Sequence, residues 1–372
     1  MHNKNVVIIQ NKPTQFDSPL YNQIATNKNF NLFLFYTNDI QSDDEININP
    51  TWNNTKETTY NLFFNNSISS IFKKIIKINP DLIILCGWFP ISHYILAILL
   101  KIKGYKIGLR SDNISDYSRM NSIKKIYMPF ILNIYNTWHP VGQLAGKFLN
   151  TISLTKKNIY YFPYTIDVDW FRDRNKFYKQ DIDKYKKKLG INENDFVVLG
   201  VLKWNDREDP ITLINAILEA STKMNCLKLI LVGDGPLRPT LQEIFIKSPN
   251  IFITPGYVTY ADLPLYYSLS NIFIHPAILE PFGVSVQEAL SCGLPVITSD
   301  KVGSRHDFIN IDSTGDVFPV GNYIELSKLI LKWEKKLRDP NFSNDEKYFK
   351  EAKKLSYDFT INQFSKYFTD NS

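Results

Sequence analysis

NIFIHPAILEPFGVSVQEALSCGLPVITSD, residues 271–300, is the stretch that decides the fold. Two short apolar strands, NIFIHPA and LPVITSD, flank a helix that is expected to begin near Gly283 or Val284. The apolar stripe of this helix follows the i, i+3, i+4, i+7 spacing of a buried face: Val286, Ala289, Leu290 and Gly293. A strand, a helix and a second strand in this order are typical of a parallel sheet covered by helices.

The same alternation of strands and helices runs through both halves of the chain. The first half contains the strand-like segments NVVIIQ, NLFLFY, DLIILCG and KIGLRSD, and the second half adds FVVLGVL and LKLILVG. Their Val, Ile and Leu runs are continuous, as expected for parallel strands buried on both faces. The sequence therefore predicts an α/β protein with two Rossmann-like, doubly wound parallel-sheet domains facing a central cleft.

The chain of 372 residues is long enough for two such domains. We expect the first over residues 1–172, a charge-rich linker over 173–190 and the second domain over 191–345. The remaining residues, 346–372, are expected to form a helical segment that packs back on the first domain.

Charge is distributed unevenly along the chain. Residues 1–172 contain 18 Lys and Arg against 11 Asp and Glu, a net charge of +7, and the remaining 25 against 26 give −1. A basic half favours an anionic membrane surface or a phosphorylated substrate. Nucleic acid is not expected as a partner, because no helix-turn-helix, aromatic RNA-binding motif or Lys/Arg block is present in the sequence.

The sequence also carries signals about location. Its first residues lack the pattern of a signal peptide, and the longest apolar run, Tyr94–Leu100, is too short to span a bilayer, so we expect a cytoplasmic protein. Residues 122–135 combine adjacent lysines with apolar residues. They fit either an interfacial membrane helix or a buried crossover helix. The three cysteines are expected to be reduced packing residues.

Glu280 and Glu288 bracket the predicted start of the helix. A glycosidase pair needs carboxyl groups about 5 Å or roughly 6.5 to 9.5 Å apart. The helix alone rises about 7.5 Å from Gly283 to Glu288, which disfavours such a pair. The spacing favours an extended ligand with its phosphates at the helix start, and Ser285 and Glu288 are expected to face this ligand together.

Several motifs together resemble the retaining glycosyltransferases of family four, which have the GT-B fold. They are DLIILCGWFP, LRSDN, YFPYTIDVDWF, LVGDGPLRPTLQ, PGYV, DLPLYYSLSNIFIHPAILEPFG and the two glutamates separated by seven residues. The resemblance covers most of the chain. It implies that the second domain binds a nucleotide-sugar and the first domain an acceptor.

The resemblance also implies catalytic residues. Glu280 matches the glutamate near the donor sugar hydroxyls, and Lys203 and Arg207 match a basic pair that neutralises the diphosphate leaving group. Glu208 stands close to the position where relatives carry lysine, which is a departure from the pattern. Arg110 and Asp112, at the end of a predicted strand in the first domain, are expected to line the acceptor site.

Further residues match the family's nucleotide-sugar contacts. Glu288 matches the carboxylate that binds the ribose, and Tyr257 and Val258 match the segment whose backbone contacts the nucleobase. The sugar and diphosphate contacts correspond to Phe282, Gly283, Val284 and Ser285. Gly233 and Gly235 in GDGP either lie near the nucleotide or only end a strand.

The implied reaction moves a sugar from a nucleotide-sugar to an acceptor hydroxyl with retention of configuration and without a cofactor or metal. A glycan or lipid-linked glycan acceptor would place the chain in polysaccharide or lipopolysaccharide synthesis. An anionic membrane surface, on the inner face of the cytoplasmic membrane, is a further expected partner. An epimerase or phosphorylase of the same fold, and a nucleotide-sugar-binding scaffold without activity, are the alternatives. DVD, residues 167–169, is expected to cap a helix and not to bind a metal.

Overall fold

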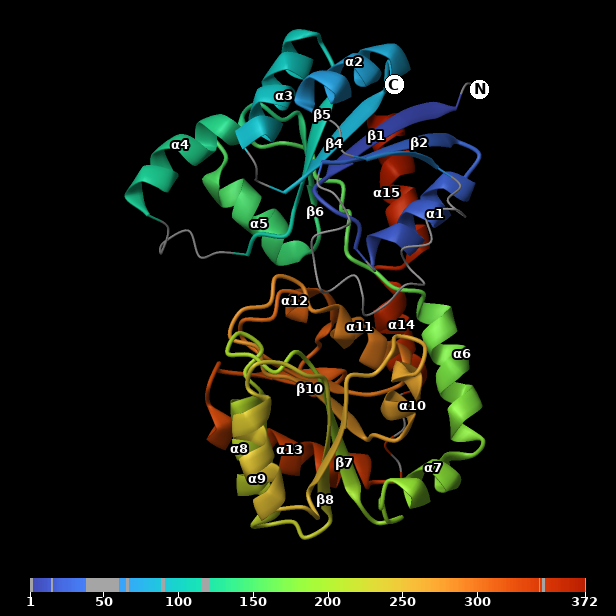
Figure 1. Cartoon of the computed structure of the whole chain (residues 1–372), viewed down its shortest axis with the longest axis vertical. Helices are drawn as coiled ribbons and strands as arrows, with labels where there is room; N and C mark the ends of the chain where they lie inside the picture. The colour runs from blue at the N-terminus through green and yellow to red at the C-terminus, as the bar shows by residue number, and fades with distance from the viewer. Residues whose placement is uncertain are drawn as a thin grey trace. The chain divides into compact units, whose positions relative to one another are not determined.

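The apolar runs form two six-stranded sheets in which every strand pairing is parallel. The structure, a computed structural model, describes residues 3–14, 16–37, 60–64, 67–87, 91–114, 121–340, 342 and 345–371. Gln15 and residues 88–90 of the quoted motifs lie outside these described residues. The chain divides into two compact units, Met1–Ile166 with Leu355–Ser372 (unit 1) and Asp167–Lys354 (unit 2) (Figure 1).

Unit 1 contains a sheet in the order β3-β2-β1-β4-β5-β6. Its strands are β1 (Lys4–Gln10), β2 (Phe30–Tyr36), β3 (Asn61–Phe63), β4 (Leu82–Cys86), β5 (Ile107–Ser111) and β6 (Thr137–Pro140). Its helices are α1 (Asp17–Thr26), α2 (Ile68–Ile78), α3 (Ile91–Ile102), α4 (Ser122–Leu132), α5 (Gln143–Ile152) and α15 (Tyr357–Asp370).

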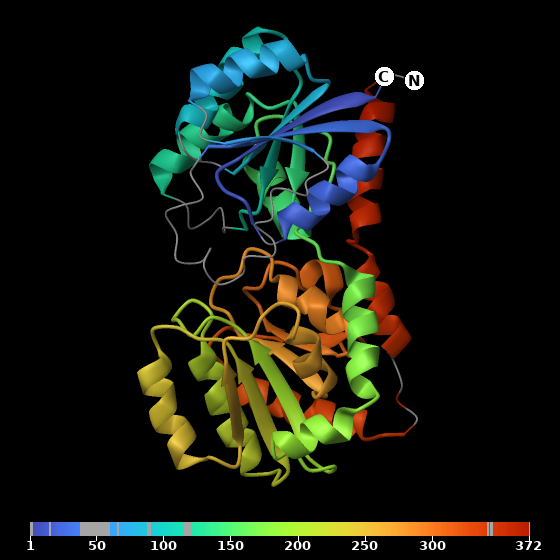
Figure 2. The ribbon, with the colours of Figure 1, turned by 45° about the vertical axis from the view of Figure 1, so that its right-hand side comes forward.

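Two hydrophobic cores enclose this sheet. Val7 and Ile9 of β1 face the core shared with α2, α3, α4 and α5, whereas Val6 and Ile8 face the core shared with α1 and α15. Figure 2 shows α1 and α15 side by side on their face of the sheet. Burial on both faces explains why the strand sequences are apolar without alternation.

Unit 2 contains a sheet in the order β12-β11-β10-β7-β8-β9. Its strands are β7 (Phe196–Val201), β8 (Leu227–Val232), β9 (Phe252–Gly256), β10 (Ile272–His275), β11 (Val296–Ser299) and β12 (Gly315–Phe318). Its helices are α6 (Val168–Lys179), α7 (Ile182–Lys188), α8 (Pro210–Ser221), α9 (Arg238–Lys247), α10 (Leu263–Ser268), α11 (Val284–Ser291), α12 (Arg305–Phe308), α13 (Tyr323–Leu337) and α14 (Asp345–Lys353).

Both sheets have the same strand order, in which the first strand of each unit pairs with its second and its fourth. The order therefore reverses between β1 and β4 in unit 1 and between β7 and β10 in unit 2. Ligands of doubly wound sheets bind outside the carboxyl ends of the strands at such a reversal. The predicted pair of doubly wound parallel sheets is confirmed.

The units divide at residues other than the predicted ones. Residues 173–190, predicted as a linker, instead lie within unit 2 as part of α6 and as α7. Their charged composition hides an amphipathic helix, because Phe171, Asn175 and Tyr178 of α6 are buried. At the C-terminus, unit 1 takes up the chain from Leu355 onward, whereas α14 belongs to unit 2.

Helix α15 is hydrogen-bonded to the rest of unit 1. The amide oxygen of Gln363 accepts from the backbone N–H of Tyr161 at 3.1 Å, and the hydroxyl of Tyr160 donates to Asp370 at 3.0 Å. At the start of unit 2, Asp167 caps α6, since its carboxylate accepts from the N–H of Trp170 at 2.9 Å. This is the role that the sequence predicted for DVD.

The cap of α6 gives a first prediction. Asp167→Ala should lower the free energy of unfolding of unit 2 by about 1 kcal/mol, because the N–H of Trp170 loses its acceptor. Asp169→Ala is the matched control, since this residue makes only an exposed ion pair with Lys353, which contributes about 0–1 kcal/mol. Urea unfolding measures both, and equal losses would contradict the cap.

Candidate functional site

The reversal point of unit 2 brings together the loops that follow β7 and β10. The backbone N–H of Ile278, after β10, donates to the carbonyl oxygen of Arg207, after β7, at 2.8 Å. The side chains then meet as well, because the guanidinium of Arg207 lies 3.7 Å from the carboxylate of Glu280. Two predicted site residues that are distant in sequence thus lie together at the expected edge of the sheet.

Glu208 closes the loop after β7. Its carboxylate is buried and accepts from the backbone N–H of Lys203 at 2.6 Å, while its own N–H donates to the side chain of Asn205 at 2.9 Å. The side chains of Lys203 and Arg207 are exposed. The acidic residue at a position near the family's lysine therefore shapes the loop that carries both cations.

Gly233 and Gly235 let the loop after β8 pack against the loop after β7. Gly233 has φ +136°, and a Cβ there would lie 1.9 Å from the carbonyl oxygen of Leu202. A Cβ on Gly235 would lie 2.5 Å from the carbonyl oxygen of Trp204. Only glycine allows this approach. The close contacts explain the glycines by packing, and their proximity to a nucleotide stays a prediction.

The loop from Glu280 to Gly283 is held by a third loop that the sequence analysis missed. The N–H of Glu280 donates to the carbonyl oxygen of Lys301 at 3.2 Å, and the N–H of Gly303 donates to that of Glu280 at 2.8 Å. Phe282 is buried beside Phe308. Contacts between separate loops leave no pattern in a single sequence that would predict them.

Helix α11 begins directly after this loop. Gly283 adopts the left-handed conformation at φ +88°, and the N–H of Phe282 donates to the carboxylate of Glu280 at 3.3 Å. Val284 and Ser285 form the first turn, where backbone N–H groups have no partner within the helix. These amides and the positive end of the helix dipole suit an anionic group.

Glu288, which was expected to face a ligand together with Ser285, is buried in the structure. It is only 4% exposed, and its carboxylate accepts from the hydroxyl of Tyr267 in α10 at 2.7 Å. Burial raises the pKa of Glu288 to about 7, although the bond from Tyr267 acts in the opposite direction. Helix α11 is covered by α6, α10 and α14 as well as by its own sheet, and the expected ligand contact of Glu288 stays a prediction.

Tyr257 and Val258 follow β9, the edge strand two positions from β7 in the sheet. The side chain of Tyr257 is exposed, and Val258 is partly buried. Both stand at the same carboxyl edge of the sheet as Lys203 and Glu280, because all six strands are parallel. This is the edge at which a nucleotide would be expected.

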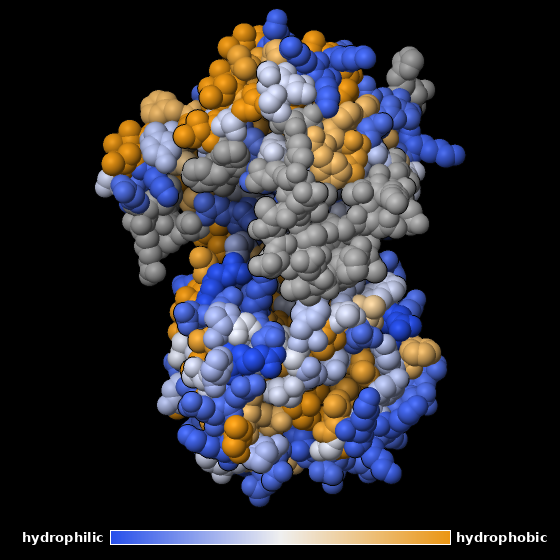
Figure 3. Space-filling view, viewed as in Figure 1, coloured by the Kyte–Doolittle hydropathy of each residue, from blue (hydrophilic) through white to orange (hydrophobic). Residues whose placement is uncertain are grey.

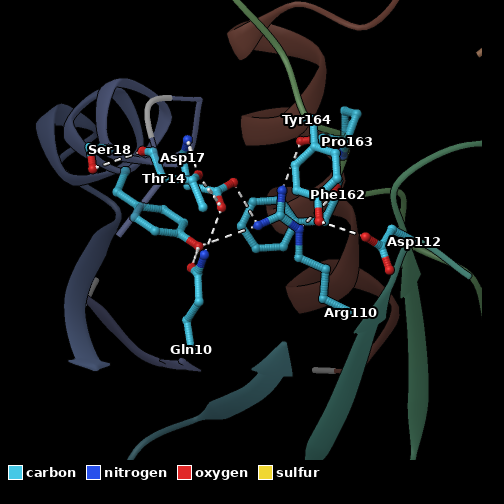
Figure 4. Close-up of polar contacts among 10 residues, drawn as sticks. Gln10, Thr14, Asp17, Ser18, Arg110, Asp112, Phe162, Pro163 and Tyr164 are labelled. Atoms are coloured by element: carbon cyan, nitrogen blue, oxygen red, sulfur yellow. Dashed lines mark hydrogen bonds and ion pairs between the residues drawn. The ribbon is translucent and has the colours of Figure 1, made fainter. Parts of the chain in front are cut away.

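Arg110 and Asp112 lie in unit 1, where Arg110 is the centre of a buried polar network (Figure 4). Arg110 is 3% exposed and pairs with the fully buried Asp17 at 2.7 Å. Its guanidinium also donates to the backbone oxygens of Phe162 at 3.0 Å and Pro163 at 3.1 Å. The pair therefore joins the start of α1, the end of β5 and the segment that leads out of unit 1.

Further hydrogen bonds surround this ion pair. Gln10 and Thr14 each donate to the second carboxylate oxygen of Asp17 at 2.8 Å. Asp112 accepts from the hydroxyl of Tyr164 at 3.1 Å. These contacts give Arg110 a structural role. The acceptor-side roles expected for Arg110 and Asp112 stay predictions. The guanidinium of Arg110 is buried, so the structure offers no exposed N–H group of this residue to an acceptor.

Two expected absences can be compared with the described residues. Within the described ranges, no three His, Cys, Asp or Glu side chains come together as a metal-binding group. Metal independence stays a prediction. No helix in the described part of the chain has the length and apolar character needed to cross a membrane.

The buried ion pair gives a second prediction. Arg110→Met should lower the free energy of unfolding of unit 1 by about 3–5 kcal/mol, because the charge of Asp17 is left buried without its partner. The double variant Asp17→Leu/Arg110→Met removes both charges and should recover much of this loss. Urea unfolding tests this, and an Arg110→Met variant as stable as the unmodified chain would contradict the structural role.

The pKa of Glu288 gives a third prediction. Since the folded-state pKa is raised above the ordinary value of 4.5, the folded chain binds more protons than the unfolded chain between pH 4.5 and about 7. Stability should therefore fall as the pH rises through this window, by a total of order 3 kcal/mol. Glu288→Gln should abolish this dependence and be the more stable protein above about pH 7.

Glu243→Gln, at an exposed position on α9, is the matched control for this measurement. It should leave the pH profile of the unfolding free energy unchanged. Parallel profiles for Glu288→Gln and the unmodified chain would show that Glu288 is not the buried titrating group.

Comparison with known proteins gives a family match that lies almost entirely within unit 2. Residues 181–355 match the family model of glycosyl transferases group 1. The chain is 28% identical over 126 residues to alpha-monoglucosyldiacylglycerol synthase of Acholeplasma laidlawii, covering 33% of this chain and 32% of that protein. It is 38% identical over 97 residues to a GDP-mannose-dependent alpha-mannosyltransferase of Mycobacterium tuberculosis, covering 26% and 24%. The chain thus matches about a third or less of each of these two relatives' lengths.

Solved structures resemble the whole chain. A glycosyltransferase of Rickettsia africae has a TM-score of 0.79 at 16% identity, with 100% of this chain and 99% of that chain covered. Anabaena HepE, solved in complex with UDP, has a TM-score of 0.77 at 16% identity, with 99% and 100% covered. The predicted fold of two Rossmann-like domains is confirmed by both, and residues 181–355 are similar to the glycosyl transferases group 1.

Proposed function

We propose that this chain is a retaining glycosyltransferase that moves a sugar from a nucleotide-sugar to a hydroxyl of a glycan or lipid-linked glycan. The observation that carries the proposal is the reversal point of unit 2. There the cations of Lys203 and Arg207, the carboxylate of Glu280 and the amino end of α11 share one edge of the sheet.

This arrangement suits a diphosphate leaving group. Negative charge builds on the departing nucleotide, and positioned cations and helix N–H groups stabilise it. The ion pair between Arg207 and Glu280 is long, at 3.7 Å, and the Arg207 side chain is half exposed, so a diphosphate can compete for the guanidinium. Glu280 would then be released to accept from sugar hydroxyls.

Glu288 is the proposed ribose ligand. Tyr267 donates to one carboxylate oxygen, Oε2, and so fixes the orientation of the group. We assign the other oxygen, Oε1, to the ribose hydroxyls. The backbone of Tyr257 and Val258 is the proposed contact of the nucleobase, and no cofactor or metal enters the proposed reaction.

The proposed acceptor class is inferred from the names of similar proteins. The names of two matching proteins refer to a glucosyldiacylglycerol and to mannosyl transfer, which supports a glycolipid or glycan acceptor in this family. We propose polysaccharide or lipopolysaccharide synthesis at the inner face of the cytoplasmic membrane, with the chain attached peripherally. Acceptor binding by unit 1 belongs to this proposal.

Two alternatives use the same donor site. An epimerase or phosphorylase would consume the nucleotide-sugar or its product without forming a new glycoside. The scaffold alternative is motivated partly by the departure at Glu208, whose carboxylate and N–H are hydrogen-bonded within the loop after β7. That observation favours an active enzyme over a scaffold.

The transfer activity gives a fourth prediction. With a panel of UDP-, GDP- and ADP-sugars and a membrane lipid extract, the unmodified chain should release nucleoside diphosphate and form a new glycoside. Lys203→Ala and Glu280→Gln should each lower kcat by about 10²-fold, because charge at the leaving group or contact to the donor sugar is lost.

Lys223→Ala, which removes an exposed lysine at the end of α8, should retain full activity. Donor binding without turnover in any extract would support the scaffold. Nucleotide release without a new glycoside would support hydrolysis or one of the other enzymes.

A further inference from the structure

Helix α3 is apolar on two opposite sides. His93, Leu96, Ala97 and Leu100 face the core of unit 1. The other side carries five exposed residues, 40% to 75% accessible, at the spacing of one helical stripe: Ile91, Ile95, Ile98, Leu99 and Ile102. A surface helix of a globular protein ordinarily carries polar residues on its outer side. The outer stripe of α3 is therefore unusual for a helix exposed to water.

Helix α4 repeats this feature. Met128 and Leu132 are buried in the same core. Its outer stripe, 38% to 69% accessible, consists of Ile123, Ile126, Tyr127 and Phe130. Helix α4 thus has one side in the core and the other exposed as an apolar surface, and its contact with a membrane stays a prediction.

The two helices form one surface. The ammonium group of Lys101, in the last turn of α3, donates to the carbonyl oxygens of Asn133 at 2.8 Å and Ile134 at 2.7 Å, just beyond α4. Figure 3 shows hydrophobic residues (orange) beside hydrophilic residues (blue) over this part of unit 1. We call the two outer stripes the α3–α4 face.

The four helices on this side of the unit 1 sheet carry charges of one sign. Helices α2, α3, α4 and α5 contain lysines, among them Lys73, Lys124 and Lys147, and not one Asp or Glu. A symmetric contact with a second copy would place these lysines opposite one another, which is unfavourable. Apolar stripes with flanking lysines are instead the composition of helices that lie in an anionic lipid surface.

We propose that the α3–α4 face docks on an anionic lipid bilayer, with both outer stripes inserted at the level of the headgroups. This names the surface for the peripheral attachment proposed above and adds α3, which sequence reasoning did not connect with a membrane. The inference rests on exposure and charge, and binding to lipid needs neither donor nor acceptor.

Vesicle flotation tests this docking and is the fifth prediction. The full chain should bind vesicles of phosphatidylcholine mixed with phosphatidylglycerol more tightly than vesicles of phosphatidylcholine alone. Lys124→Gln/Lys125→Gln should weaken binding to the anionic vesicles about 25-fold, since each lysine near such a surface contributes about fivefold. The matched control is Lys187→Gln/Lys188→Gln on α7, which should bind as the unmodified chain does.

The apolar stripes are tested separately. Ile95→Gln/Ile102→Gln on α3 and Ile126→Gln/Phe130→Gln on α4 should each abolish most of the binding, because these exposed side chains enter the bilayer. Ile246→Gln, at an equally exposed site on α9, should have no effect. Circular dichroism of each variant checks that the fold is intact.

Three results would overturn the docking. They are absence of binding by the unmodified chain, equal loss in the control variants, and a dimer in solution that the α3 variant abolishes while vesicle binding is unaffected. Failure here is distinguishable from failure of the proposed transfer, because flotation is measured without any sugar donor. Transfer to a water-soluble acceptor by a chain that does not float would contradict only the docking.

Discussion

The hydrogen bond from the N–H of Ile278 to the carbonyl oxygen of Arg207 is the contact on which the candidate site depends. It ties the loop after β7 to the loop after β10, at the one place where the strand order of unit 2 reverses. Glu208 closes the first loop from within, and the loop around Lys301 and Gly303 holds the second. The donor site is thus a set of backbone contacts that carry a few exposed charged side chains.

In unit 1, a buried ion pair plays the structural role that the backbone contact between loops plays in unit 2. Arg110 and Asp17 are 93 residues apart in sequence, yet their contact joins the start of α1 to the end of β5. The same guanidinium holds the backbone at Phe162 and Pro163. Unit 1 therefore uses its buried charges to organise its own carboxyl edge, whereas unit 2 leaves its cations exposed for a ligand.

The fold could be predicted from the sequence because its signal is local. Runs such as residues 196–201 and 272–275 are apolar throughout, and burial on both faces of a parallel sheet requires this. The family resemblance then placed Lys203, Arg207 and Glu280 in one site, and the structure brings Arg207 and Glu280 within ion-pair distance.

Other features could not be predicted, because they depend on what covers a residue from elsewhere in the chain. The stripe of α11 indicated one buried side, but Tyr267 and α14 cover further sides and bury Glu288. In the same way, the many charged residues of α6 gave no sign of its packed side, so residues 173–190 were predicted as a linker. Conversely, the outer stripe of α3 could not be recognised as exposed, since an apolar residue in a sequence does not show whether anything covers it.

A crystal structure of the full chain with a bound nucleoside diphosphate tests the central claim most directly. The account predicts that the diphosphate contacts the backbone amides at the start of α11 and the side chains of Lys203 and Arg207. Density for the diphosphate at the carboxyl edge of the unit 1 sheet, or with Lys203 and Arg207 turned away from it, would contradict the account.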